Sequence, residues 1–143
     1  MILGNSGRLV ELCIVERERA PAADVRVMAR VVLGDFVAAV DTWIVAAAWD
    51  AFIAQVVQLE RTRRGEAVLE GVPTHELHLR IAAIDRAGHM SVAGTLRTFY
   101  AAGAGSHRPS SVTLEFGDVE FDPTLLPVLI RELSRGPSAD AVE

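Results

Sequence analysis

The stretch of sequence that decides the fold lies near the middle of the chain and reads Ala46-Ala-Ala-Trp-Asp-Ala-Phe-Ile-Ala-Gln-Val-Val-Gln-Leu-Glu-Arg-Thr-Arg-Arg-Gly65. Its apolar residues recur every three or four positions, which predicts a helix over 46–64 with one broad apolar face. The arginines at its end complement the negative pole of the helix dipole, and we expect Gly65 to supply a left-handed stop. Asp41 or Thr42 could instead cap a longer helix that includes Trp43.

Three segments before this helix alternate apolar and polar residues, a pattern typical of β-strands with one buried face. They cover residues 9–16, 24–33 and 36–44. Ala20-Pro-Ala-Ala23 separates the first two as a turn, and Gly34-Asp35 separates the second from the third. We expect residues 1–7 to be a flexible lead-in.

The strand pattern returns after Gly65, over residues 67–70, 76–84, 89–100 and 112–121. Asp85-Arg-Ala-Gly88 has the residues of a type I turn and predicts a hairpin. Residues 71–74 and 101–110 are predicted loops, the second rich in Gly, Ala and Ser. The alternation slips by one residue at Gly117-Asp118, which predicts a β-bulge in the last strand.

The sequence predicts a second helix that opens at Asp122-Pro-Thr124, with the aspartate as N-cap and the proline in the first turn. Its apolar face runs to Leu133, and Gly136-Pro137 ends it. The predicted order is βββ-α-ββββ-α, an α+β fold built on a mostly antiparallel sheet of about seven strands. We expect residues 1–136 to form a single domain and 137–143 a disordered tail, and no internal repeat is visible.

The composition points to a water-soluble domain. Half of the 143 residues are apolar, yet no apolar run approaches the roughly 20 residues that span a bilayer. The N-terminus lacks the order of a secretory signal, so we expect a cytoplasmic protein without membrane association. The net charge of -5 argues against nucleic-acid binding. The single cysteine, Cys13, excludes an internal disulfide and is expected to be buried and inert.

No catalytic, cofactor-binding or metal-binding constellation is visible in the sequence. The four histidines, at positions 75, 78, 89 and 107, lack the paired spacing of a zinc site. Asp85 and His89 flank one turn and could touch, but an acid–base pair also needs a nucleophile or a substrate pocket. The simpler interpretation is that Asp85 shapes the turn. If the protein were an enzyme, His78, Asp85 and His89 would be the first residues to test.

Charged residues on the sheet provide the candidate binding surface. Arg26, Arg30, Arg80 and Arg97 are predicted to share one solvent face, which could hold an anion or an acidic partner. A diffuse acidic surface is the opposite hypothesis, formed by Glu16, Glu18, Glu115, Asp118, Glu120 and Asp122. An ordinary solvated face explains both patterns more simply. The candidate binding residues are Glu115, Asp118, Glu120, Arg80 and Arg97.

Six segments between Phe36 and Leu133 carry a family resemblance: Trp49-Asp-Ala-Phe-Ile-Ala-Gln-Val-Val-Gln-Leu59, Gly65-Glu-Ala-Val-Leu-Glu70, Leu77-His-Leu-Arg-Ile81, Asp85-Arg-Ala-Gly-His-Met90, Leu114-Glu-Phe116 and Asp122-Pro-Thr-Leu-Leu126. Together they resemble the WapI-like immunity proteins of bacterial polymorphic-toxin systems and related uncharacterised actinobacterial domains. The resemblance covers about two-thirds of the chain. The segment 101–110 departs from it, because a tighter hairpin is expected there.

The resemblance implies a small cytoplasmic protein that neutralises a toxin domain by binding it, with no catalytic residues to carry over. The leading hypothesis is therefore a non-enzymatic protein whose partner is a cognate toxin. The alternative is a small-ligand-binding or regulatory module with its pocket between the helix at 46–64 and the sheet. An enzyme ranks third. An exposed sheet edge would also permit a homodimer.

Overall fold

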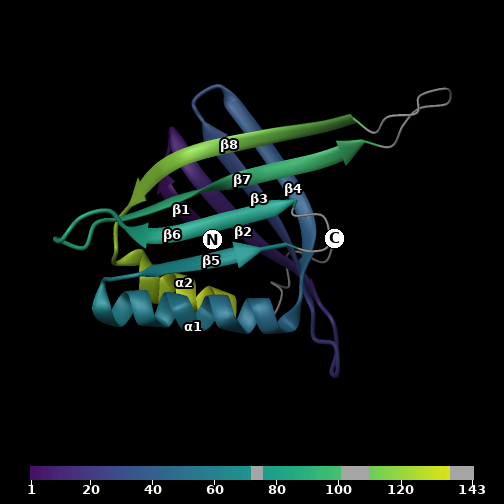
Figure 1. The fold of residues 1–143 in the computed structure, drawn as a ribbon, viewed down its shortest axis with the longest axis horizontal. Helices are drawn as coiled ribbons and strands as arrows, with labels where there is room; N and C mark the ends of the chain where they lie inside the picture. The colour runs from purple at the N-terminus through teal and green to yellow at the C-terminus, as the bar shows by residue number, and fades with distance from the viewer. Residues whose placement is uncertain (72–75, 101–109, 136–143) are drawn as a thin grey trace.

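Strands and helices alternate in blocks in the computed structural model, which describes residues 1–71, 76–100 and 110–135 (Figure 1). In chain order the elements are β1 (Ile2–Asn5), β2 (Arg8–Arg17), β3 (Val25–Leu33), β4 (Phe36–Ile44), α1 (Ala46–Thr62), β5 (Glu66–Glu70), β6 (Leu77–Ala83), β7 (Met90–Tyr100), β8 (Ser110–Phe121) and α2 (Leu125–Ser134). All the paired strands are antiparallel. The predicted α+β class is confirmed. The predicted loops 71–74 and 101–110 and the predicted tail 137–143 lie outside the described residues, apart from Gly71 and Ser110.

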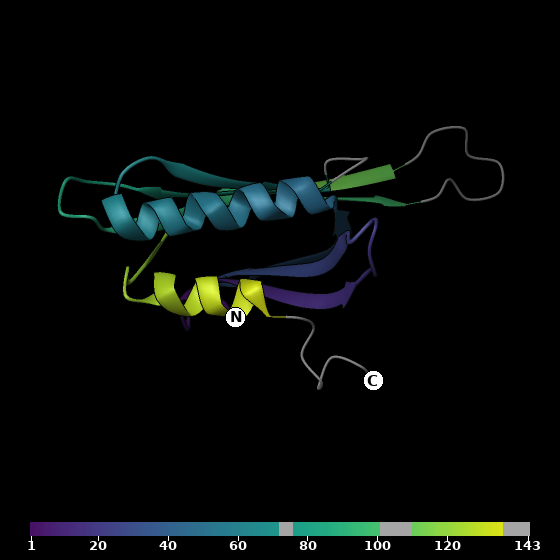
Figure 2. The same ribbon diagram turned by 90° about the horizontal axis from the view of Figure 1, so that it is seen from below.

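The strands form two separate sheets, where the sequence predicted one sheet of about seven strands. The first sheet has the order β1-β2-β3-β4 and the second the order β5-β6-β7-β8. Within each sheet, short connections make sequence neighbours into pairing partners. The prediction of one sheet was wrong because α1 intervenes between β4 and β5 and carries the chain from one layer to the other (Figure 2).

Strand β1 occupies the segment that was expected to be a flexible lead-in. It pairs with β2 from Ile2 opposite Glu11 to Asn5 opposite Arg8. The Asn5 side-chain Oδ1 accepts hydrogen bonds from the backbone N–H groups of Gly7 (3.0 Å) and Arg8 (3.1 Å), which closes the turn. Leu3 is buried in the core. A strand of four residues is too short for alternation to reveal, so tertiary pairing decides it.

The two sheets pack face to face around one hydrophobic core. Strand β3 shows the principle, because Val25, Val27, Ala29 and Val31 are buried while the residues between them are half-buried. Strands β6 and β7 contribute matching buried residues from the second sheet, among them Leu79, Ile81 and Val92. We call the side of each sheet that points away from this core its outer face.

The helices lie side by side along one margin of the sandwich (Figures 1 and 2). Helix α1 packs along β5 and buries Trp49, Phe52, Val56 and Leu59. Helix α2 packs against α1 and buries three leucines of its apolar face. Each fully buried large side chain stabilises the fold by about 1.5–3 kcal/mol through removal from water. The helices therefore cover one margin of the sandwich (Figure 2).

Helix α1 begins at Ala46, as predicted, but ends at Thr62, before the predicted end at residue 64. Its N-cap is Val45, because Asp41 and Thr42 belong to β4. The carboxylate of Asp24, far away in sequence, accepts a hydrogen bond from the Ala46 backbone N–H at 2.9 Å. At the other end Arg63, and not Gly65, is the left-handed cap with φ of 57°. Its N–H donates to the Leu59 carbonyl at 2.8 Å.

The predicted bulge in β8 is confirmed. Val92 of β7 pairs with Val119, and Gly94 pairs with Phe116, so β8 carries one extra residue at Gly117-Asp118. This extra residue lets Phe116 and Val119 both point into the core.

The turn into α2 uses Asp122 as expected, although the helix itself begins at Leu125 with Thr124 as its N-cap. The Asp122 carboxylate accepts a hydrogen bond from the Thr124 N–H at 2.9 Å, and its carbonyl accepts one from Leu125. The backbone hydrogen bond from Thr124 holds the pKa of Asp122 below its ordinary value.

The order of elements repeats, which no similarity in the sequence reveals. Residues 1–62 run through four strands and a helix, and the chain then runs through four strands and a helix again. The helix of the first half packs on β5 of the second sheet, while α2 lies level with the first sheet (Figure 2). The two halves are therefore tied together by their helices.

Candidate binding surfaces

The five predicted binding residues lie on the outer face of the second sheet. Register places Arg80 opposite Val68 and Ala93, Arg97 opposite Thr113, and Glu115 opposite Thr95. Glu120 pairs with Ser91, and the Asp118 carboxylate accepts a hydrogen bond from the Ser91 hydroxyl at 3.2 Å. The structure thus brings the five onto one face but spreads them over three strands.

These residues are largely engaged with neighbours of their own sheet. The Arg80 guanidinium contacts the Glu66 carboxylate at 3.2 Å, with both side chains about half exposed. The Arg97 Nε donates to the Thr113 hydroxyl at 3.2 Å. Exposed pairs of this kind contribute at most about 1 kcal/mol each. The face is polar, wet and internally paired.

The prediction that four arginines share one face was wrong. Arg26 and Arg30 lie on the outer face of the first sheet, whereas Arg80 and Arg97 lie on the outer face of the second. Because the two sheets pack through their inner faces, the two pairs point in opposite directions. An anion site built from all four is excluded by this geometry.

The residues that would be tested first in an enzyme do not converge. His78 sits at the start of β6 and its Nδ1 lies 3.9 Å from the Glu70 carboxylate. Asp85 and His89 lie beyond the other end of that strand and contact each other across the turn, with 2.5 Å between the carboxylate and the imidazole Nδ1. The Asp85 Oδ1 also accepts the His89 backbone N–H at 3.2 Å, as expected for a turn residue.

The contact between Asp85 and His89 shifts the pKa of both groups. The hydrogen bond from His89 lowers the pKa of Asp85 below its ordinary value. The same hydrogen bond raises the pKa of His89, and the nearby charge of Glu120 adds to the effect. The charged forms are thus favoured on both sides. The pair is exposed, with 66% of the His89 side chain and 44% of the Asp85 side chain accessible.

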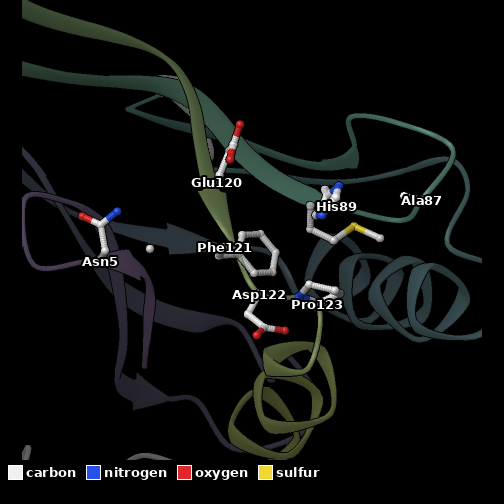
Figure 3. Close-up of a pocket in the computed structure, with 9 residues that line it drawn as sticks. Asn5, Ala87, His89, Glu120, Phe121, Asp122 and Pro123 are labelled. Atoms are coloured by element: carbon white, nitrogen blue, oxygen red, sulfur yellow. The ribbon is translucent and has the colours of Figure 1, made fainter.

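A depression of about 590 Å³ lies beside this pair (Figure 3). Its walls come from the end of β1, the turn between β6 and β7 with the start of β7, and the end of β8 with the turn that follows it. They comprise Gly4, Asn5, Ala87, His89, Met90, Glu120, Phe121, Asp122 and Pro123. In Figure 3 Asn5 lies on the opposite side from His89 and Glu120. The site is at the end of the sandwich.

The small-ligand hypothesis placed its pocket between α1 and the sheet, and the structure corrects that position. The side chains of Trp49, Phe52, Val56 and Leu59 fill that interface and are at most 1% exposed. Among residues 1–71, 76–100 and 110–135, no group of three or more His, Cys, Asp or Glu side chains is placed to hold a metal ion.

The outer face of the first sheet differs from that of the second, because apolar side chains line much of it. Leu9, Val32 and Val37 lie opposite one another on β2, β3 and β4, and we call them the apolar row. Val37 is 58% exposed, and the other two are half-buried. The same face carries further apolar or weakly polar residues, namely Ile2, Cys13, Met28, Ala39 and Trp43.

The charges on this face are tied into cross-strand ion pairs. Arg26 binds Asp41 through two hydrogen bonds of 2.8 and 2.7 Å, and it also lies 3.6 Å from Glu16. Arg30 lies 3.7 Å from Glu11. Cross-strand ion pairing thus leaves the apolar row as the distinctive feature. Cys13 is half-buried here, not fully buried, and partial burial raises the pKa of its thiol.

Next to the apolar row, the β3–β4 hairpin ends in an exposed aromatic residue. Phe36 is 71% exposed, the highest value among the exposed large apolar side chains of the described residues. In Figure 1 the tip of this hairpin projects beyond β8. The alternation over residues 36–44 did not identify Phe36 and Val37 as surface residues. Their position directly after Gly34-Asp35 was the available signal, because a strand end at a tight turn often lies beyond the core.

Comparison with known proteins adds no assignment. Of the described helices, neither has the length and apolar character required to cross a membrane. No family model, no curated protein and no solved structure matches the chain.

Proposed function

We propose that this protein is a non-enzymatic binding protein that acts in the cytoplasm as an immunity protein, neutralising a cognate bacterial toxin by covering part of its surface. The observation that carries the proposal is the outer face of the first sheet. It combines the apolar row with internally paired charges, and the exposed Phe36 lies beside it at the start of β4.

Such a surface has the composition of a protein–protein interface. The buried centre of an interface is depleted in free charge and enriched in aromatic and aliphatic anchors. Arg26 and Arg30 are already paired with carboxylates of their own chain, so a partner covering them need not supply a counter-ion. On the second sheet Arg80 is also paired, but that face carries polar side chains such as Thr95 and Glu115, which a partner would have to desolvate.

The choice of a toxin as partner rests on the resemblance to WapI-like immunity proteins. The net charge of -5 is compatible with a basic toxin domain, because opposite net charges accelerate encounter. A purely blocking protein needs no catalytic residues. Its task would be to occupy a surface and not to turn over a substrate.

Growth rescue tests the proposal directly. A candidate toxin domain, taken from a reading frame beside this gene, would be expressed in a bacterial host with and without the full chain. We expect the chain to restore growth and to co-purify with the toxin domain as a stoichiometric complex. Continued growth arrest, with the chain soluble and in excess over the toxin domain, would refute the proposal.

A second candidate function, a small-ligand or regulatory module, is favoured by the depression beside His89 and Glu120. Clefts of about 300–1,000 Å³ are typical of small-molecule sites, although such sites are usually more apolar and enclosed. Native mass spectrometry of the purified chain tests this candidate. A bound small molecule that is lost on substituting His89→Ala would favour it, and a mass equal to that of the bare chain would count against it.

A further inference from the structure

Strand β4 is the free margin of the first sheet. It pairs with β3 in unbroken register from Phe36 opposite Leu33 to Ile44 opposite Val25. Within the described part of the chain no strand pairs with its other side. A margin of this kind presents unpaired backbone N–H and C=O groups, to which a further strand can bind.

The side chains of β4 set the chemistry of that margin. Val37 and Ala39 are exposed on its outer face, and Phe36 is exposed at its start. Asp35 and Asp41 flank these three residues, and both are exposed. No lysine or arginine occurs between Arg30 and Arg61. The stretch from Asp35 to Asp41 is therefore apolar in the middle and acidic at both ends.

We propose that an extended, basic segment of a partner protein adds to β4 as a fifth strand of the first sheet. Its backbone would pair with β4, its apolar side chains would cover Val37 and Ala39, and its arginines or lysines would face Asp35 and Asp41. This inference rests on the proposed function, since it names the surface and the partner chemistry by which the protein would bind its toxin.

Charge favours a basic partner over a second copy of the chain. Antiparallel pairing of β4 with itself would bring two copies of Asp35 and two of Asp41 onto one short ribbon, with no cation contributed by either strand. Asp41 is partly neutralised by Arg26, but Arg26 also faces Glu16, so this cluster remains net negative. Like charges placed across a strand pair are destabilising.

The other margins are less suited to strand addition. Helix α1 packs along β5 and occupies the margin of the second sheet. Strand β8 is acidic as well, but its register is broken by the bulge at Gly117-Asp118. Bulges twist an edge away from flat pairing and are a known protection against it. Strand β1 spans only four residues.

Two exposed valines allow a matched test. Val37 on β4 and Val112 on β8 are both 58% exposed, and each lies on a marginal strand. Lysine at either position keeps a long aliphatic stem, so we expect both V37K and V112K to fold. Only V37K places a positive charge at the margin where the basic strand is expected to bind.

The first experiment uses a synthetic peptide that alternates valine with arginine and threonine, and a control peptide with glutamate in place of each arginine. Binding to the full chain is followed by fluorescence anisotropy, and its position by backbone amide chemical shifts. We expect the arginine peptide to bind and to shift the amides of residues 36–41. V37K should weaken that binding by about tenfold or more, and V112K by less than about twofold.

Substitution at Asp35 separates the charge from the apolar contact. Asp35→Asn should weaken binding of the arginine peptide a few-fold. It should also reduce the salt dependence of that affinity, because one carboxylate is removed. Equal binding of the two peptides, equal effects of V37K and V112K, or shifts that map to β8 would each overturn the inference. Dimerisation of the chain alone that V37K abolishes would overturn it too, since the occupant would then be a second copy.

The same variants distinguish failure of this inference from failure of the proposed function. If the wild-type chain rescues growth and V37K rescues as well as V112K does, the immunity function stands and the β4 surface is wrong. If the wild-type chain fails to rescue growth but the peptide binds β4 as described, the surface is correct and its natural partner is another protein.

Discussion

The first half of the chain, residues 1–62, and the second half, from Glu66 to Ser134, pass through the same order of four strands and a helix but present different outer faces. In the first half that face carries the apolar row and charges tied into cross-strand ion pairs. In the second it carries Arg80, Thr95, Glu115 and similar polar residues.

The difference shows that the inner and outer faces of the sheets are under different physical constraints. Both inner faces must fill one shared core, so both alternate with buried aliphatic residues such as Val27 and Leu79. The outer faces are free of that demand. The polar face of the second sheet is stable in contact with water, whereas removing the apolar row of the first sheet from water would be energetically favourable. The five predictions below test this contrast, from the largest expected effect to the smallest.

Truncation of a phenylalanine should lower the stability of the fold far more in the core than at the hairpin tip. Phe52→Ala removes a ring that is fully buried between α1 and the second sheet and should cost about 3–5 kcal/mol of unfolding free energy. Phe36→Ala removes a ring that is 71% exposed and should change the stability by less than about 0.5 kcal/mol. Urea denaturation of both variants measures the difference. Similar losses would mean that the tip belongs to the core.

The loss of stability on replacing a glycine of the second sheet by alanine should depend on the space available for the added Cβ atom. A Cβ at Gly94 would lie 2.1 Å from the His78 backbone oxygen, so Gly94→Ala should cost about 1–3 kcal/mol through a forced shift of β6 from β7. A Cβ at Gly117 in the bulge would meet no atom within 4 Å, so Gly117→Ala should be nearly neutral. Thermal melts compare the two. A neutral G94A would show that the strands separate easily.

The stability of the N-terminus of α1 should depend on Asp24, the residue just before β3. Asp24→Ala removes the acceptor of the Ala46 N–H and should cost about 0.5–2 kcal/mol. Asp24→Asn retains a side-chain oxygen and should cost less. Chemical denaturation followed by circular dichroism measures both. Equal losses for the two variants would indicate that the negative charge, and not the hydrogen bond, stabilises the helix terminus.

Ion pairs should contribute more to the stability of the fold on the first sheet than on the second. Arg26→Met breaks a two-bond contact with Asp41 and a contact with Glu16, whereas Arg80→Met breaks one exposed contact with Glu66. We expect a small fall in the urea midpoint for R26M and a smaller one for R80M, with the gap narrowing in high salt. A larger effect of R80M would reverse the contrast between the faces.

The smallest effect concerns the turn at Asp85. The pKa of His89 is raised, so its contribution to stability is complete below its ordinary value of 6.5 and is lost as the pH rises through the folded pKa. The pKa of Asp85 is lowered, so its contribution is present above 3.8 and is lost as the pH falls through the folded value. Asp85→Asn should lower the pKa of His89 toward 6.5, as an NMR titration would show. An unchanged value would mean that the pair is not formed in solution.

Local patterns in the sequence predicted much of the fold. The helical spacing around Phe52, the turn at Asp85 and the parity slip at Gly117 each predicted an element or feature that the structure confirms. The side chains of the candidate face, such as Glu115 and Arg97, were correctly expected on a solvent face. These features depend on neighbours a few residues apart, and that information is present in a single sequence.

What the sequence determined by itself is therefore which segments, β1 excepted, are strands or helices and which side of each is apolar. Only the tertiary structure decided that β4 and β5 belong to different sheets, that Asp24 caps α1, and that Arg26 and Arg80 point in opposite directions. The physical reason is that alternation shows that a strand has a buried face but does not identify the strand beside it. That pairing depends on where α1 carries the chain, and its course is set by the packing of Phe52 and its neighbours on β5.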